Sequence, residues 1–190
     1  PPRSTQGVSS AASDVYKRQV IVYTGGGKGK TSAALGLVLR AVGYNHKVCM
    51  VQFVKGSWHY GELDSAKRLA PEFELVTAGK GFVGILDDKS PREEHVKAAN
   101  DTLAISKEKI MSGKFDVVIL DEINYAVQLE LLKIDAVVDL IKSKPPELDL
   151  VLTGNHAAKE VIEIADLVTE MKEIKHPFKS GIKAKKGIDF

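Results

Sequence analysis

The sequence predicts an α/β protein with a doubly wound, mostly parallel six-stranded sheet and helices on both faces. From residue 20 onward, short runs rich in β-branched residues alternate with helical patterns, and several of these runs are continuously apolar. A strand that is apolar at every position must be covered on both faces, and strands separated by helices return in parallel. Ligands are therefore expected at the carboxyl ends of the strands.

The first run, at residues 20–24, is short, apolar and β-branched, and it breaks into glycines where a helical pattern begins. The second run surrounds Cys49, and the fourth has four apolar residues that end in two carboxylates. Lys142 to Glu147 contains two prolines, which predicts a helix stop and a loop. The expected strands are 20–24, 47–53, 73–77, 116–120, 149–153 and 167–173, and the expected helices are 30–42, 62–70, 91–112, 134–142 and 157–165.

The loop after the first strand has the sequence Thr-Gly-Gly-Gly-Lys-Gly-Lys-Thr-Ser. Its glycines let successive backbone N–H groups turn inward and form a nest for phosphate oxygens. The following helix adds the positive end of its dipole. We predict a phosphate-binding loop in which Lys30 contacts phosphates and the Thr31 hydroxyl binds Mg²⁺. The predicted ATP-binding residues are Thr24, Gly25, Gly26, Gly27, Lys28, Gly29, Lys30, Thr31 and Ser32.

Thr24 stands where the usual phosphate-loop pattern has its first glycine. The alternative interpretation is an ordinary glycine-rich turn between a strand and a helix. The order of strand, glycine-rich turn and helix favours the nucleotide site.

Composition places the chain among ordinary globular proteins, with 44% hydrophobic and 27% charged residues in 190. A formal net charge of +2 gives no reason to expect nucleic acid or a membrane surface as a partner. The lone Cys49 cannot form an internal disulfide, which fits the cytoplasm, and it is interpreted as a small buried hydrophobe. Residues 1–19 show no periodicity, so they are expected to be non-native sequence or a disordered tail before a single domain at 20–190.

A second motif, Asp-Val-Val-Ile-Leu-Asp-Glu, covers residues 116–122. A buried strand can present an acidic side chain at its tip to a metal ion held by the phosphate loop. Asp121 and Glu122 are the candidates, together with Thr31. The alternative is a solvated strand end without a ligand. Asn124 and Tyr125 fit a pocket, a helix cap or a packed aromatic equally well.

A third motif follows the second strand, where Lys55, Trp58, His59 and Tyr60 come within six residues. Aromatic side chains this dense at the carboxyl end of a strand indicate a ligand surface. The alternative is that they only cover the sheet edge. His59 has no Cys or His partner at metal-ligand spacing, so a metal role is not favoured.

Six ordered blocks resemble the CobA-type ATP:corrinoid adenosyltransferases, from about residue 20 to the C-terminus. The blocks are Thr24 to Ser32, Val51-Gln-Phe-Val-Lys-Gly56, Leu120-Asp-Glu-Ile-Asn-Tyr125, Leu152-Thr-Gly154, Ala165 to Met171, and Lys175-His-Pro-Phe with Gly181-Ile-Lys-Ala and Gly187-Ile-Asp-Phe190. The resemblance implies a P-loop NTPase-like, RecA-like fold. It also implies a transferase that moves the 5′-deoxyadenosyl group of ATP to Co(I) of a reduced corrinoid and releases triphosphate.

The resemblance implies roles for individual residues as well. Lys30, Thr31 and Glu122 are the expected catalytic residues, with Mg²⁺ or Mn²⁺ as the ion. ATP is held in the reverse sense along the loop, which is consistent with Thr24 at the first position. Phe82 matches an aromatic that displaces the axial base of the corrin, and Trp58 and Lys55 are further corrinoid-binding candidates.

The resemblance further implies a cytoplasmic homodimer that works with a flavodoxin-like or other reductase in cobalamin biosynthesis or corrinoid salvage. Two positions depart from the family pattern, because Gly84 stands in place of a Trp and Asn155 in place of an Arg. The alternative functions are a P-loop ATPase or nucleotide kinase acting at the γ-phosphate, and a non-catalytic corrinoid or nucleotide carrier. The sequence leaves open which corrinoid is preferred.

Overall fold

The computed structural model describes residues 18–55, 59–79 and 90–190. In this part of the chain, six strands form one sheet in the order β3-β2-β4-β5-β1-β6, and every pairing is parallel. The strands are β1 (Val20–Thr24), β2 (Val48–Gln52), β3 (Phe73–Thr77), β4 (Val117–Asp121), β5 (Asp149–Thr153) and β6 (Leu167–Glu170). The predicted doubly wound parallel sheet is confirmed.

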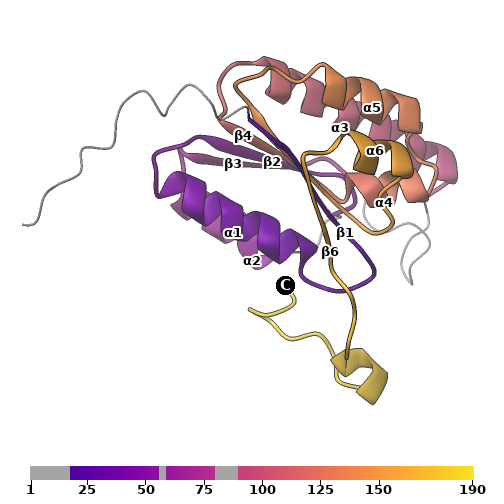
Figure 1. The fold of residues 1–190 in the computed structure, drawn as a ribbon. Helices are drawn as coiled ribbons and strands as arrows, with labels where there is room; N and C mark the ends of the chain where they lie inside the picture. Colours follow the sequence, from indigo (N-terminus) through magenta and orange to yellow (C-terminus); the bar gives the residue numbers. More distant parts are fainter. Residues whose placement is uncertain (1–17, 56–58, 80–89) are drawn as a thin grey trace, which may run out of the picture.

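Helices cover both faces of the sheet (Figure 1). The first layer contains α1 (Lys30–Val42) and α2 (Gly61–Arg68). The second contains α3 (Arg92–Met111), α4 (Ile123–Gln128), α5 (Ile134–Lys142) and α6 (Lys159–Ile164). Alternate strand residues point into the two layers, so that Met50 packs with α1 while Cys49 and Val51 pack on the opposite face. This double burial is why the central strands are apolar at successive positions.

Cys49 is fully buried, and burial raises the pKa of its thiol to about 12. It is therefore a small core residue, as the apolar run around it indicated. No helix in the part of the chain that the structure describes is long and apolar enough to cross a membrane.

Two elements differ from the sequence expectation. A short helix, α4, follows β4 directly, although no helix was expected there. The last strand ends at Glu170 instead of residue 173. The reason is that the Met171 backbone turns toward the phosphate loop, where its carbonyl accepts a hydrogen bond from the Gly27 amide at 2.6 Å. A short 3₁₀ helix (Pro177–Ser180) then interrupts the segment after β6.

Arg18 and Gln19 join the amino-terminal ends of β1, β4 and β5. The Arg18 guanidinium lies 3.4 Å from Asp116 and 3.2 Å from Asp149, and the Gln19 amide donates to Asp149 at 2.6 Å. Asp116 also accepts the Lys47 amide at 2.9 Å, so its carboxylate fixes the entry to β4. Residues 18 and 19 thus contact the sheet, while the expectation for residues 1–17 lies outside the described part of the chain.

Candidate functional site

The carboxyl ends of β1, β4 and β5 bring the predicted site residues together. Because β5 lies between β1 and β4, Thr153 at the end of β5 is placed between the phosphate loop and the Asp121-Glu122 pair. The Thr153 hydroxyl donates to Asp121 Oδ1 at 2.7 Å and accepts the Glu122 amide at 2.9 Å. One hydroxyl therefore fixes the backbone and the side chain at the tip of β4.

Asp121 is fully buried and is the centre of a hydrogen-bonded cluster. Its Oδ1 accepts the Thr31 hydroxyl at 2.9 Å, and its Oδ2 lies 3.4 Å from the Gln52 amide. Burial raises the pKa of the carboxyl, and the hydrogen bonds from Thr153 and Thr31 oppose that shift. Because the Thr31 hydrogen is directed at Asp121, the lone pairs of the hydroxyl oxygen remain available to a cation in the pocket.

Glu122 lines the pocket itself and adopts a left-handed backbone conformation, with φ of 64°. A non-glycine residue held in this region costs of order 1 kcal/mol or more, and such residues cluster at functional sites. Burial, together with the neighbouring Asp121 charge, raises the pKa of Glu122 to about 7. The group is thus poised to change charge near neutral pH.

Oxygen donors that line the pocket fit a Mg²⁺ ion. Thr31 and Glu122 supply a hydroxyl and a carboxylate, which are ligands that Mg²⁺ takes together with phosphate oxygens and water. Asp121 is fully buried and accepts the Thr31 hydroxyl from behind. Among the described residues, no three His, Cys, Asp or Glu side chains converge in a way that could hold a metal on their own.

The phosphate loop encloses the Lys30 ammonium group. Lys30 is 7% exposed, and its Nζ donates to the carbonyls of Gly25 at 2.9 Å and Gly27 at 2.8 Å. Burial lowers the pKa of Lys30, and the carboxylates of Glu122 and Asp121 oppose the shift. An ammonium has three donors, so one remains for a phosphate oxygen after these two hydrogen bonds.

Two of the loop glycines are required by a close approach of the backbone. A Cβ atom at Gly25 or Gly27 would lie 2.5 or 2.6 Å from the Met171 carbonyl oxygen. Gly25 also has a φ of 95°, which disfavours any other residue. The glycines therefore serve the contact with the segment after β6 in addition to the expected phosphate nest.

Thr24, the residue at the unusual first loop position, is 7% exposed and joins three segments. Its hydroxyl accepts the Ala157 amide at 2.9 Å, and its carbonyl accepts the Met171 amide at 2.8 Å. A glycine could make only the second of these contacts. The side chain thus ties the phosphate loop to the chain that follows β5.

A second cluster of charged side chains, Lys55 and Glu62, borders the pocket near β2 and α2. Lys55 Nζ lies 3.2 Å from Glu62 and 3.6 Å from the centre of the Tyr60 ring. The Lys55 and Glu62 side chains are only 15% and 10% exposed. Gln52 Nε2 lies 3.4 Å from Glu62 Oε1, as it does from Asp121, and so links the two carboxylates.

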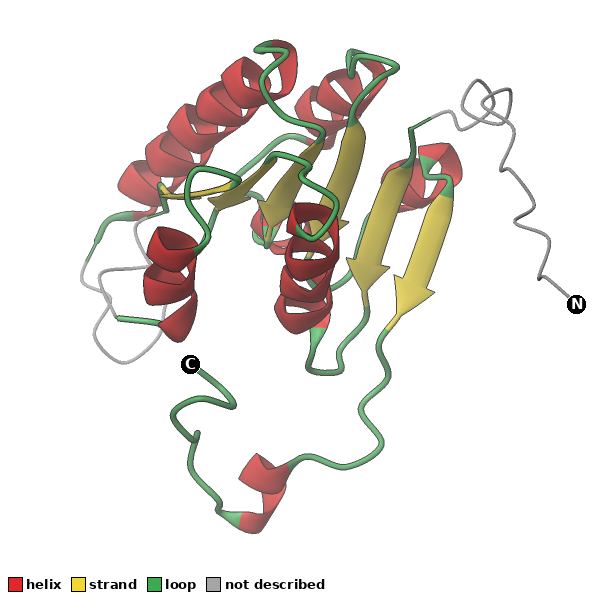
Figure 2. Cartoon of the chain, turned by 90° about the vertical axis from the view of Figure 1, so that its left-hand side faces the viewer, coloured by secondary structure: helices red, strands yellow, loops and turns green. Residues whose placement is uncertain are grey.

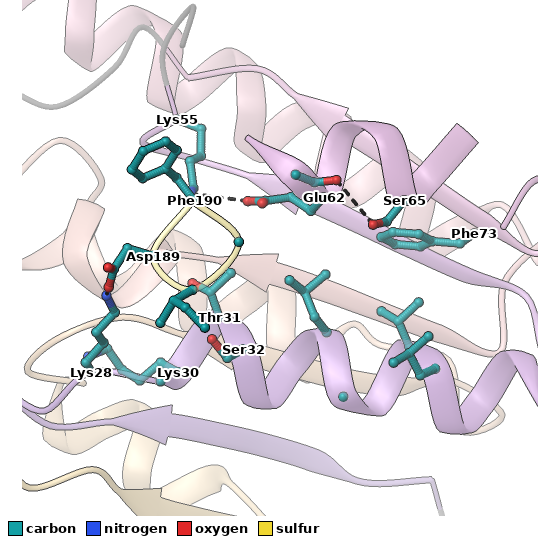
Figure 3. Close-up of a pocket in the computed structure, with 18 of the residues that line it drawn as sticks. Lys28, Lys30, Thr31, Ser32, Lys55, Glu62, Ser65, Phe73, Asp189 and Phe190 are labelled. Carbon is teal, nitrogen blue, oxygen red and sulfur yellow. Dashed lines mark hydrogen bonds and ion pairs between the residues drawn. The ribbon is translucent and has the colours of Figure 1, made fainter. Parts of the chain in front are cut away.

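These groups surround a pocket of about 650 Å³ that the structure places between the phosphate loop, α1 and α2 (Figure 3). Lys28, Lys30 and Thr31 line one side, and Lys55 and Glu62 line another. This volume lies within the usual range of small-ligand pockets and is large enough for a nucleotide.

The structure therefore brings Lys30, Thr31, Asp121, Glu122 and Lys55 to one end of the sheet. Trp58 and Phe82, two of the corrinoid-binding candidates, lie outside the described residues, and so does Gly84. His59 bonds Asp64 at 2.8 Å on an exposed surface. Asn124 is buried in α4, and its Nδ2 has no hydrogen-bond partner among the residues that the structure describes.

Sequence reasoning gave no individual role to five residues of this region, although four of them lie within the blocks that resemble the family. Gln52 and Thr153 are polar residues at the ends of otherwise apolar strands, a signal that could have identified them. Glu62 lies two residues after Tyr60, the last residue of the aromatic motif. No local pattern marks the contacts of Met171 and Asp189 with the phosphate loop, because their partners lie more than 140 residues away.

The fold and the site define a class: a doubly wound parallel α/β protein with a glycine-rich loop before its first helix and an acidic pair at the tip of a neighbouring strand. The family model described as ATP:corrinoid adenosyltransferase BtuR/CobO/CobP matches residues 16–190. The chain belongs to this family, as its sequence motifs predicted.

Relatives from three bacteria are similar over most of their length. The corrinoid adenosyltransferase of Sinorhizobium sp. is 39% identical over 176 residues, which cover 92% of this chain and 81% of the relative. The corrinoid adenosyltransferase of Escherichia coli (strain K12) is 36% identical, and corrinoid adenosyltransferase CobA of Salmonella typhimurium is 33% identical. Each of these two alignments spans 171 residues, 90% of this chain and 85% of the relative.

Proposed function

We propose that this protein transfers the 5′-deoxyadenosyl group of ATP to the cobalt of a Co(I) corrinoid. The observation that carries the proposal is the family match over residues 16–190, on a chain whose phosphate loop and acidic pair border one pocket. Co(I) attacks the ribose C5′ with its electron pair. The cobalt–carbon bond forms as the C5′–oxygen bond breaks, and triphosphate leaves with the electrons of that bond. Cobalt is thereby oxidised from Co(I) to Co(III).

The protein's tasks in this reaction are alignment and charge stabilisation, because the corrinoid substrate supplies the nucleophile. Lys30 is assigned to the triphosphate, since its ammonium is held inside the loop with one donor left over. The remaining loop residues, from Thr24 to Ser32, are assigned to ATP binding.

Thr31 and Glu122 are assigned to direct binding of Mg²⁺, because both line the pocket. Asp121 is assigned to orienting Thr31 and balancing the charge from behind, since it is fully buried and already bonded to that hydroxyl. When bound, the ion would neutralise charge on the leaving triphosphate.

The corrinoid is assigned to the side of the pocket that carries Lys55. Glu62 and Tyr60 hold this ammonium at the pocket, where it can interact with polar groups of the corrin periphery. Trp58 and Phe82 are proposed as the aromatic surface for the corrin.

Further proposals are a flavodoxin-like or other reductase as the electron donor, a homodimer, a single domain at residues 20–190 and a cytoplasmic location.

Product analysis tests the proposal. The protein is incubated with ATP, Mg²⁺ and chemically reduced Co(I) corrinoid, and the phosphate products are separated by chromatography. We expect adenosylated corrinoid and triphosphate in equal amounts. Formation of ADP in place of triphosphate would refute adenosyl transfer and support an ATPase or kinase, and absence of any product would indicate a carrier.

A further inference from the structure

The segment after β6 is attached to the phosphate loop at both of its ends. At its start, the Met171 carbonyl accepts the Gly27 amide at 2.6 Å. At its far end, Asp189 forms an ion pair with Lys28, the next residue of the same loop. Between these points the chain runs away from the sheet and then returns toward α1 and α2 (Figures 1 and 2).

Asp189 also organises the turn that carries it. Its Oδ1 pairs with Lys28, while its Oδ2 accepts the Lys185 amide at 2.6 Å. The Asp189 amide donates back to the Lys185 carbonyl at 2.8 Å, and the Gly187 amide donates to the Phe190 carbonyl at 2.7 Å. The Asp189 side chain is 21% exposed, in a stretch where residues 181–188 are all exposed. One carboxylate therefore shapes the turn and fastens it to the loop.

This turn is part of the pocket wall. Residues 187–190 line the same pocket as Lys30, Thr31 and Glu122. In Figure 3, Asp189 lies against Lys28, and Phe190 is drawn on the side of Lys55. Ile188 and Phe190 are 70% and 42% exposed, which leaves apolar surface at the pocket that a bound ligand can cover.

We propose that residues 187–190 form part of the nucleotide-binding site, and that Asp189 is a positioning residue that holds this turn over ATP through Lys28. The proposal rests only on the ATP-binding half of the proposed function. The Lys28–Asp189 pair stays closed when ATP binds, so that Ile188 and Phe190 pack over the nucleoside triphosphate and exclude water from it.

The direction in which ATP affinity changes when Asp189 loses its charge separates a positioning role from a purely electrostatic one. Removing a negative charge beside a triphosphate strengthens ATP binding if charge alone matters, or if Asp189 competes with phosphates for Lys28. A positioning role predicts the reverse, because the turn is no longer fastened to the loop. We expect Asp189→Asn to weaken ATP binding by about five-fold, the upper end for a partly exposed ion pair.

The measurement is calorimetric titration of the full chain with Mg-ATP in the absence of corrinoid, where no adenosyl transfer occurs. The matched control is Glu173→Gln. It removes an equal charge from the same segment and breaks the ion pair between Glu173 and Lys179, two residues of the segment itself. We expect ATP affinity in this control to match the wild type.

Trypsin digestion supplies a second readout, because Lys183, Lys185 and Lys186 lie next to the turn. ATP should slow cleavage there in the wild type and in Glu173→Gln, but not in Asp189→Asn. Tighter or unchanged ATP binding by Asp189→Asn would overturn the proposal, as would equal weakening by both variants. If the wild type binds no ATP, the proposed function fails as well, whereas normal wild-type binding confines the failure to the role of Asp189.

Discussion

Replacement of Glu122 by Gln tests whether this carboxylate is held at an energetic cost in the free protein. Burial is the main reason that the pKa of Glu122 lies at about 7 instead of its ordinary 4.5, and the neighbouring Asp121 charge adds to it. The difference corresponds to about 3 kcal/mol, at about 1.4 kcal/mol per pH unit. Gln has nearly the same shape but no charge, so the variant does not lose stability through ionisation of a buried carboxyl.

The direction in which stability changes with pH follows from proton binding by Glu122. The folded protein holds the Glu122 proton more tightly than the unfolded chain does. The contribution of this group to stability is therefore largest below pH 4.5 and is lost as the pH rises through 7. Between pH 5.5 and pH 8.0 the loss is about 2 kcal/mol. The Gln variant lacks this term, so we expect it to be more stable than the wild type at pH 8.0 and to show a smaller change in stability between the two pH values.

Urea denaturation of both proteins at pH 5.5 and pH 8.0, without Mg²⁺ or ATP, measures the four free energies of unfolding. Groups other than Glu122 contribute in both proteins, so the difference between their pH dependences reports Glu122 together with its coupling to Asp121 and Lys30. Identical pH dependence in the two proteins would refute the reasoning. The same variant should need a higher Mg²⁺ concentration for half-maximal adenosylation, with a smaller effect on ATP binding, because it removes an ionised metal ligand.

Two further predictions concern activity. Lys30→Ala should slow adenosylation by roughly 10² or more, because it removes a charge that stabilises the leaving triphosphate, while circular dichroism shows an unchanged fold; near-normal turnover would contradict the role of the loop. Phe82→Ala should lose activity mainly when the assay starts from Co(II) corrinoid with a reductase, and much less with chemically supplied Co(I), because an open lower face lets water or the axial base bind cobalt. Equal losses in the two assays would leave Phe82 a purely structural role.

Local sequence determined the elements and the order in which they occur. Apolar β-branched runs and helical patterns are properties of neighbouring residues. The sequence therefore predicted the six described strands and five of the described helices, and most predicted ends lie within two residues of the observed ends. The phosphate loop and the acidic strand tip were predicted for the same reason, since each is a contiguous motif. The family assignment depended on several such motifs in a fixed order, and the family match over residues 16–190 confirms it.

Contacts between distant segments were decided only by the tertiary structure. The sequence did not indicate that β5 separates β1 from β4, so the bridging role of Thr153 could not be foreseen. The helix α4 was also missed, because it is only six residues long and begins immediately after the strand.

The end of β6 at Glu170 was also decided by a contact between distant segments. Whether residues 171–173 extend a strand depends on what their backbone groups meet, and the Met171 carbonyl meets the Gly27 amide. The ion pair between Lys28 and Asp189 likewise joins residues that no periodicity connects. Propensity acts over a few neighbouring residues, whereas the free energy of these contacts depends on partners that only the folded chain brings together.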